Sequence, residues 1–235
     1  MYSTTRIIQI AISVLLVMLS VVPHEVAHGW MADKLGDHTA RQAGRLSLNP
    51  AKHIDPVGSI LLPLIMGLLG GPIFAYAKPV PYNPMNFKRE TRRRDEALVA
   101  LAGPVMNFIE ALAGTALYYL ALNGFEGALM SEALPIDPWL EVASWVVSIL
   151  YSYVYVNLML MCFNLIPLPP LDGSKVISIF IKSDGARRAY YQVQRYSMPI
   201  LIAVLYLIPY AFGVDPLGWL LDVTAGNLCN LLLGA

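Results

Sequence analysis

Long apolar runs without charged side chains dominate the sequence. A helix needs roughly 20 such residues to cross the ~30 Å hydrocarbon core of a bilayer. Two of the six runs carry a single acid each, Glu110 and Asp222, and the other four carry no charged residue. The pattern predicts an all-α polytopic membrane protein with about five to six transmembrane helices. The six runs are 7–22 with the turns after it, 57–77, 97–122, 142–171, 196–214 and 216–235.

Composition supports a membrane location. Hydrophobic residues make up 57% of the 235-residue chain and charged residues only 14%, and the mean hydropathy is +0.56. These values exclude an ordinary soluble domain, and the net charge of zero argues against a nucleic-acid partner. No small-residue cleavage site follows the first run, so we expect it to remain in the mature protein. Cys162 and Cys229 lie in apolar runs without CxxC spacing, which predicts neither a disulfide nor a thiolate zinc site.

The distribution of charge predicts the topology. Lysine and arginine cluster in 88–94 and 175–195, and the positive-inside rule places both segments in the cytoplasm. The stretch 123–141 has four acids and no lysine or arginine, so it is expected outside. Helices over 97–122 and 140–166 should therefore form an antiparallel pair. Such a pair returns Asp172 to the cytoplasmic side.

The second apolar run, 57–77, does not fit a simple crossing. The preceding stretch 33–56 is basic and also prefers the cytoplasm, so the run must enter and leave on one side. Pro63 and the Gly70-Gly71-Pro72 break favour a re-entrant or interfacial hairpin. The alternative is an ordinary span with a basic outer loop. The proline-rich segment 77–84 cannot be helical and is predicted to be extended.

His24-Glu25-Val26-Ala27-His28 follows the first run and forms an HExxH motif. Four residues are about 1.1 helical turns, so both imidazoles project from one face and can bind one tetrahedral metal ion. Glu25 then lies beside the open coordination position as a general base. The alternative is a polar helix end at the water interface. An apolar helix delivers these groups, and ionisable groups at such depth are costly unless they are paired or metal-bound.

A catalytic zinc site usually has three protein ligands. His38 and His53 could supply the third, but His53 lies in a basic polar loop and is expected to be solvated. Asp172 is the better candidate, because the predicted topology places it at the membrane face where the HExxH helix ends. The alternative for Asp172 is a helix N-cap.

Two further elements carry a family resemblance: Asn164-Leu165-Ile166-Pro167 followed by Leu171-Asp172-Gly173, and Ala102-Gly103-Pro104 followed by Asn107. With HExxH, they resemble the site-2 protease family of intramembrane zinc metalloproteases, in a minimal form without a PDZ or CBS domain. The resemblance implies one zinc ion per chain, held by His24, His28 and Asp172, with Glu25 as catalytic base. It also implies that Asn164 lies near the scissile carbonyl. The implied substrate is a transmembrane protein segment, already cut by another protease and cleaved near the cytoplasmic face.

We expect a single membrane domain over 1–235, with a catalytic core of about 7–182 and accessory helices of about 190–235, in the cell membrane. Val80 and Tyr82 of the extended segment could pair with an unwound substrate as an added strand. Asn107 favours close helix packing over substrate contact, and Glu110 should face the bundle interior or a water path. The rival functions are a transporter or channel, for which inverted repeats are missing, and an inactive helix-binding relative.

Overall fold

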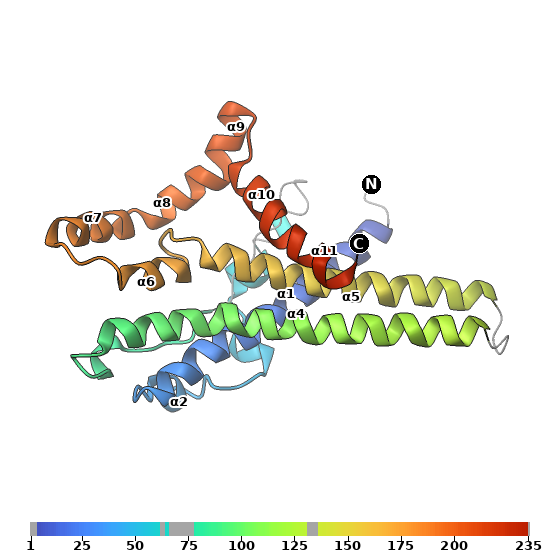
Figure 1. Cartoon of the computed structure of the whole chain (residues 1–235), viewed down its shortest axis with the longest axis horizontal. Helices are drawn as coiled ribbons and strands as arrows, with labels where there is room; N and C mark the ends of the chain where they lie inside the picture. Colours follow the sequence, from blue (N-terminus) through green and yellow to red (C-terminus); the bar gives the residue numbers. More distant parts are fainter. Residues whose placement is uncertain (1–3, 62–63, 66–77, 131–135, 235) are drawn as a thin grey trace.

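Three long helices form the body of the molecule (Figure 1). The computed structural model describes residues 4–61, 64–65, 78–130 and 136–234, and all regular elements in these residues are helical. The long helices are α1 (Thr4–Lys34), α4 (Arg92–Met130) and α5 (Ile136–Leu165). Each is long and apolar enough to cross a membrane, and a bent helix pair near the C-terminus can supply a fourth span. The all-helical class is confirmed, whereas the predicted count of five to six spans is not.

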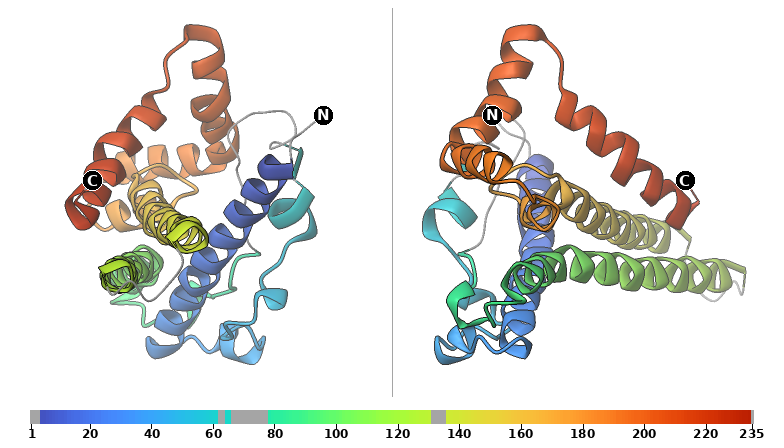
Figure 2. Two further views of the ribbon diagram at one scale, coloured as in Figure 1. Left: turned by 90° about the vertical axis from the view of Figure 1, so that its right-hand side faces the viewer. Right: turned by 60° about the vertical axis from the view of Figure 1, so that its left-hand side comes forward.

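Helices α4 and α5 run antiparallel and lie side by side, as the sequence predicts (Figure 1). Helix α1 crosses this pair at a steep angle and packs against both helices (Figure 2). Small residues permit the close approach, since a Cβ atom on Gly114 of α4 would lie 2.9 Å from Val154 of α5. Ala111, Val154 and Leu158 form the buried centre of this contact. Because lipid is as apolar as leucine, such close packing is the main force between membrane helices.

The predicted outer loop over 123–141 is largely helical, which corrects the expectation. Helix α4 continues to Met130 and α5 begins at Ile136, so only 131–135, which lies outside the described residues, separates them. Gly124 and Gly127 lower helix propensity by only about 1 kcal/mol each. Proline stops a helix far more effectively, and no proline occurs between Asn123 and Met130. The charge pattern predicts on which side of the membrane this stretch lies, but it does not predict whether the stretch is helical.

Short elements connect α1 to α4. The residues over 78–83 form neither helix nor strand, in agreement with the predicted extended segment. The prediction was wrong for Pro84, which begins the short helix η3, because proline fits the first position of a helix, where no backbone N–H is needed. Most of the run 57–77, including Pro63 and 70–72, lies outside the described residues. The hairpin and its alternative therefore both stay predictions. The short elements are α2 (Thr39–Gln42), η1 (Pro50–Lys52), η2 (Pro56–Leu61) and η3 (Pro84–Asn86).

After α5 the chain turns back into a series of shorter helices. Helix α7 (Asp184–Arg195) and the 197–212 helix that follows meet at 69°. Gly213 adopts φ 65°, and beyond it the chain reverses so that α11 packs on α4 and α5 (Figure 1). Whether 216–235 crosses the membrane stays a prediction. The elements are α6 (Asp172–Ser178), α7 (Asp184–Arg195), α8 (Ser197–Ile202), η4 (Ala203–Leu207), α9 (Ile208–Phe212), α10 (Pro216–Leu221), η5 (Asp222–Gly226) and α11 (Asn227–Leu233).

Replacing Gly114 tests the contact between α4 and α5. Gly114→Leu should lower the free energy of unfolding by about 1–3 kcal/mol, because the new side chain would overlap Val154. The readout is the thermal unfolding midpoint of the purified protein in detergent. Gly124→Leu is the matched control, since a Cβ atom there meets nothing within 4 Å. Equal midpoints for the two variants would contradict the observed packing.

Candidate metal centre

The two histidines of the HExxH motif lie on the C-terminal half of α1 and face one point. His24 and His28 are 5% and 9% exposed, and their Nε2 atoms are 3.0 Å apart. Their ring planes are nearly perpendicular. The i, i+4 spacing on an apolar helix therefore brings two imidazole nitrogens together inside the protein, as expected.

Asp172 completes the group from the start of α6. Its Oδ2 atom lies 3.4 Å from His24 Nε2 and 3.2 Å from His28 Nε2. Within the described part of the chain, these three residues are the one group of three or more His, Cys, Asp or Glu side chains spaced to hold a metal ion. Leu171 occupies the N-cap position and Asp172 is the first helical residue. The N-cap alternative for Asp172 is therefore wrong.

The loop between α5 and α6 brings Asp172 to α1. Gly173 is required there, because a Cβ atom on it would collide with the backbone carbonyl oxygen of Leu165 and lie 2.6 Å from that of Ile166. The proline-rich loop can then turn tightly enough for α6 to start beside α1. The Asp-Gly pair thus has two roles: one residue supplies the carboxylate and the next permits the close turn.

The donor set fits zinc. Zinc bonds to nitrogen and oxygen are roughly 2.0–2.2 Å long, so ligand atoms around a tetrahedral ion lie about 3.4 Å apart. The three observed separations are 3.0, 3.2 and 3.4 Å. Two imidazoles and one carboxylate leave the fourth position for water, as in catalytic zinc sites.

Hydrogen bonds on the far side of each ring orient the nitrogens. His28 Nδ1 lies 2.7 Å from the carbonyl oxygen of Val99, and His24 Nδ1 lies 2.5 Å from Asn107 Oδ1. Both partners are on α4. A proton on each Nδ1 leaves the Nε2 lone pairs directed at the shared point, which is the form that binds a metal.

Asp172 is the acidic member of the ligand group, and it is largely buried. Lys175 Nζ lies 3.8 Å from Asp172 Oδ1 and adds positive charge on the outer side. The site therefore presents one negative charge and two lone pairs to a cation.

Gly103 keeps the metal position open, a role that the sequence did not reveal. It lies on α4, and a Cβ atom on it would sit 2.5 Å from the Nε2 atoms of both His24 and His28. From the sequence, Gly103, like Asn107, is expected to favour close helix packing over substrate contact. Its position in the Ala102-Gly103-Pro104 element was the available signal.

Glu25 contacts the extended segment that precedes α4. Its Oε2 atom accepts a 2.9 Å hydrogen bond from the Val80 backbone N–H. Val80 is buried, and Gly29 leaves room for its side chain, because a Cβ atom there would lie 2.6 Å from Val80 Cγ1. The candidate base is thus held by a backbone amide from outside the HExxH helix.

Both ends of this segment are anchored. The Lys78 N–H donates to the His53 carbonyl oxygen at 2.8 Å, and Arg45 donates to the Lys78 carbonyl oxygen at 2.7 Å. At the other end, the Asn83 N–H donates to the buried Asp37 carboxylate at 2.6 Å. Residues 78–83 therefore form a fixed wall beside Glu25.

Tyr82 of this wall contacts Lys175, which also pairs with the ligand Asp172. The Lys175 ammonium lies 5.4 Å from the centroid of the Tyr82 ring, and Tyr82 stacks on Phe87. Val80 and Tyr82, both predicted to contact substrate, thus lie beside the base and near a metal ligand respectively.

Three other candidate residues have their hydrogen bonds outside the ligand group. Asn164, near the end of α5, donates to the Leu160 carbonyl oxygen of its own helix at 3.0 Å. Its predicted place near the scissile carbonyl stays a prediction. His38 pairs with Asp33 at 2.8 Å. His53 is fully buried, with Nε2 2.7 Å from the Ser47 carbonyl oxygen, so the expected solvated state is wrong because the 47–53 loop folds over the ring.

The polar residues of α4 both lie among the helices, and one of them also contacts a metal ligand. Asn107 is fully buried and bonded to His24. Glu110 accepts a 2.9 Å hydrogen bond from the Tyr153 hydroxyl group, which agrees with its predicted interior position. The closeness of Asn107 to a metal ligand was not anticipated.

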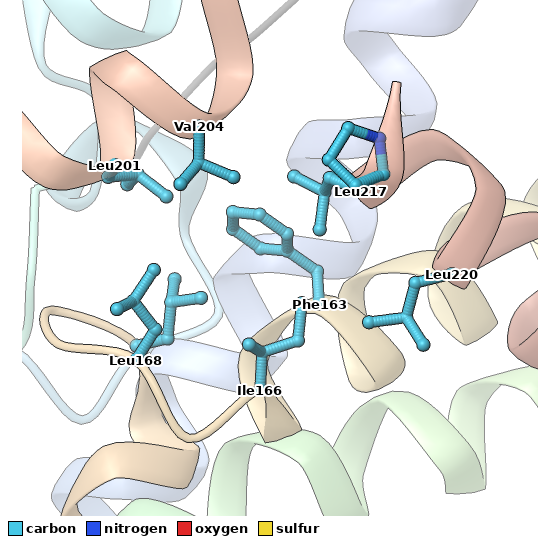
Figure 3. A pocket seen from close by; sticks show the side chains of 9 residues that line it. Phe163, Ile166, Leu168, Leu201, Val204, Leu217 and Leu220 are labelled. Carbon is cyan, nitrogen blue, oxygen red and sulfur yellow. The ribbon is translucent and has the colours of Figure 1, made fainter. Parts of the chain in front are cut away.

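An apolar pocket of about 190 Å³ lies beside the loop that ends at Asp172 (Figure 3). Phe163 and Leu220 project into it from α5 and α10, and Leu168 projects from the loop. All of its lining residues are apolar, so it cannot carry proton transfer. The chemistry belongs to the buried ligand group on α1 and α6.

The profile of the family described as Peptidase family M50 matches residues 12–208. The chain belongs to peptidase family M50. A Bacillus subtilis (strain 168) protein named "Putative zinc metalloprotease YwhC" is 36% identical over 196 residues, which cover 83% of this chain and 80% of that protein. "Putative zinc metalloprotease Rip2" of Mycobacterium tuberculosis (strain ATCC 25618 / H37Rv) is 28% identical over 211 residues, 88% of this chain and 71% of that protein. No solved structure matches the chain at a significant level.

Membership of family M50 confirms the site-2 protease resemblance. Members of this family are zinc-dependent metalloproteases, so the predicted enzyme class and metal are confirmed as well. The apolar helices and the family together make the protein membrane-embedded. The transporter or channel alternative is thereby set aside.

Gly103→Ala tests whether the space between the imidazoles is the metal position. The added methyl group would overlap both Nε2 atoms, so zinc content should fall from about one ion per chain to near zero. Zinc is measured by elemental analysis of the purified protein. Gly127→Ala serves as control, because its Cβ atom would meet nothing within 4 Å. Full zinc content in Gly103→Ala would show that the ion binds elsewhere.

Proposed function

We propose that this M50 protein is an intramembrane protease that hydrolyses peptide bonds in transmembrane segments of membrane proteins, with Glu25 activating the attacking water. The observation that carries the proposal is the convergence of His24, His28 and Asp172 at the end of an apolar membrane helix, with Glu25 one residue from the first ligand. A hydrolytic site embedded among transmembrane helices reaches substrates that are themselves in the membrane.

Each proposed group has one chemical task. His24, His28 and Asp172 hold the zinc ion, which when bound supplies a Lewis acid and brings the pKa of water towards about 7. Glu25 takes a proton from the attacking water and later passes it to the leaving amide nitrogen. Asn164 donates a hydrogen bond to the developing oxyanion, a contribution of roughly 3 kcal/mol at comparable positions.

The position of the ligand group supports cleavage near the cytoplasmic face of the cell membrane. Basic residues occur on three elements that reach this end: Lys34 ends α1, Arg92 begins α4, and Lys175 lies on α6. Figure 1 shows α2, α6 and the beginning of α4 at the same end of the molecule. By the positive-inside rule, this end faces the cytoplasm.

The segment 78–82 is the proposed docking site for an unwound substrate. A protease reaches an amide bond only after the substrate helix has opened locally, and an opened segment can pair with an extended strand. Tyr82 and Val80 lie beside the ligand and base residues. A transmembrane segment already shortened by another protease is the proposed substrate, because it is easier to unwind and admit.

Glu25→Gln tests the base and separates catalysis from metal binding. The variant should retain about one zinc ion per chain, since Glu25 is not a ligand, and should lose at least ~100-fold in the rate of cleavage. Cleavage of a model transmembrane helix is followed in proteoliposomes. His24→Ala should lose both zinc and cleavage. A Gln variant that cuts at the wild-type rate would remove Glu25 from the mechanism, and a wild type that does not cut would indicate the inactive relative.

Tyr82→Ala tests the docking segment. The variant should cleave the model helix several-fold more slowly while keeping its zinc, because the ring lies beside the site without being a ligand. Zinc content and cleavage rate are measured on the same preparation. Met85→Ala, a change at a side chain that is 69% exposed in the adjacent turn, is the control. Unchanged cleavage by Tyr82→Ala would argue against substrate pairing here.

A further inference from the structure

Two buried asparagines lie behind the ligand group, and only Asn107 contacts a ligand directly. Asn107 on α4 and Asn157 on α5 are both fully buried. An amide buried without hydrogen-bond partners costs several kcal/mol. Both side chains are bonded, and their bonds run in a line that ends on His24.

His28 provides the simple comparison. Its Nδ1 faces the Val99 backbone carbonyl oxygen. A carbonyl oxygen can only accept a hydrogen bond, so Nδ1 of His28 must carry the proton. Its Nε2 lone pair is therefore free for the metal.

His24 lacks such a direct constraint. Its Nδ1 faces the side-chain amide of Asn107, which has an acceptor end and a donor end of nearly the same shape. If Asn107 presented its NH₂ group, His24 would carry its proton on Nε2. That proton would point at His28 Nε2 and Asp172, where the metal needs a lone pair.

Backbone carbonyls settle the orientation of both amides. Asn107 Nδ2 lies 3.2 Å from the Ser20 carbonyl oxygen and 2.9 Å from Asn157 Oδ1. Asn157 Nδ2 in turn lies 3.0 Å from the Tyr153 carbonyl oxygen. Since the Ser20 and Tyr153 oxygens only accept, each asparagine must direct its NH₂ group towards them. Asn157 then offers oxygen to Asn107, and Asn107 offers oxygen to His24.

We propose that Asn157 acts through Asn107 as a positioning residue that holds His24 as its Nδ1–H tautomer, with the Nε2 lone pair directed at the metal. This inference deepens the proposed function and depends on His24 being a ligand. Metal-binding histidines usually donate their second ring N–H to such an acceptor, and loss of the acceptor typically weakens metal binding 10- to 100-fold. Here the acceptor Asn107 on α4 is itself oriented by a second residue, Asn157 on α5.

The competing explanation is helix association alone. The pair links α1, α4 and α5, and polar side chains do hold membrane helices together. This explanation predicts lower stability in proportion to lost packing. Helix association alone predicts that zinc affinity does not depend on whether the side chain at position 157 offers a hydrogen-bond donor and an acceptor.

Replacement of Asn157 separates the two explanations. Asn157→Leu keeps the approximate volume and removes the amide, and zinc affinity should fall on the order of 10-fold. Asn157→Asp, buried as the neutral acid, retains one donor and one acceptor and should bind zinc within about threefold of wild type. Asn227→Leu is the control for loss of an asparagine amide elsewhere, because the exposed Asn227 side chain donates to the carbonyl oxygen four residues earlier, that of Val223, as Asn157 does to Tyr153. Affinity is measured on the full chain in detergent by competition with a chelator.

The tautomer itself supplies the second measurement. Nitrogen chemical shifts of ¹⁵N-histidine protein without metal should show His24 protonated at Nδ1 in wild type and shifted towards Nε2 protonation in Asn157→Leu. Equal zinc affinities for wild type and Asn157→Leu would overturn the proposal. So would equal losses in the Leu and Asp variants, or an Nε2–H tautomer in wild type. A wild type that binds no zinc would instead refute the metal site, and the chemical shifts would still test the tautomer.

Discussion

The convergence of His24 Nε2, His28 Nε2 and Asp172 Oδ2 is the constraint on which the rest of the structure depends. Three ligand atoms 3.0 to 3.4 Å apart and largely shielded from water are unfavourable without a cation between them, because lone pairs and a carboxylate face one another. The C-terminal half of α1, which carries His24 and His28, and the start of α6, which carries Asp172, must therefore lie next to each other. The crossing of α1 over α4 and α5, and the turn before α6, both satisfy this requirement.

Glycine and backbone carbonyls do much of the work of building this centre. Gly103 leaves the space that the ion needs, and Gly173 lets α6 start against the end of α5. The Val99 carbonyl oxygen orients one imidazole directly. In a membrane interior, where water cannot satisfy stray polar groups, such backbone partners are reliable because each can only accept. Backbone carbonyl oxygens likewise fix the orientation of the Asn107 and Asn157 side-chain amides.

Much of the site could be predicted from the sequence, because the histidine spacing follows from local helix geometry and the position of Asp172 follows from the membrane topology. The i, i+4 histidines depend only on helical geometry, and Asp172 depends only on the charge pattern that brings α5 back to the starting side. The contact of Val80 N–H with Glu25 and the place of Asn107 behind His24 could not be predicted, since they join residues 55 and 83 positions apart. The extent of α4 and α5 was missed for another reason: charge indicates the side of the membrane and not whether a segment is folded.

The hydrogen bond from Val80 to Glu25 links the base to the proposed substrate-docking segment. A carboxylate that accepts one backbone N–H keeps further lone pairs for a water molecule, so this bond can fix the direction of Glu25 and still leave an acceptor for that water. The same stretch of backbone is anchored through Lys78 and Asn83. If an unwound substrate pairs with residues 78–82, the scissile bond and the base are positioned by one rigid element. The distance between the scissile bond and Glu25 would then vary little, and the rate of such a reaction depends strongly on this distance.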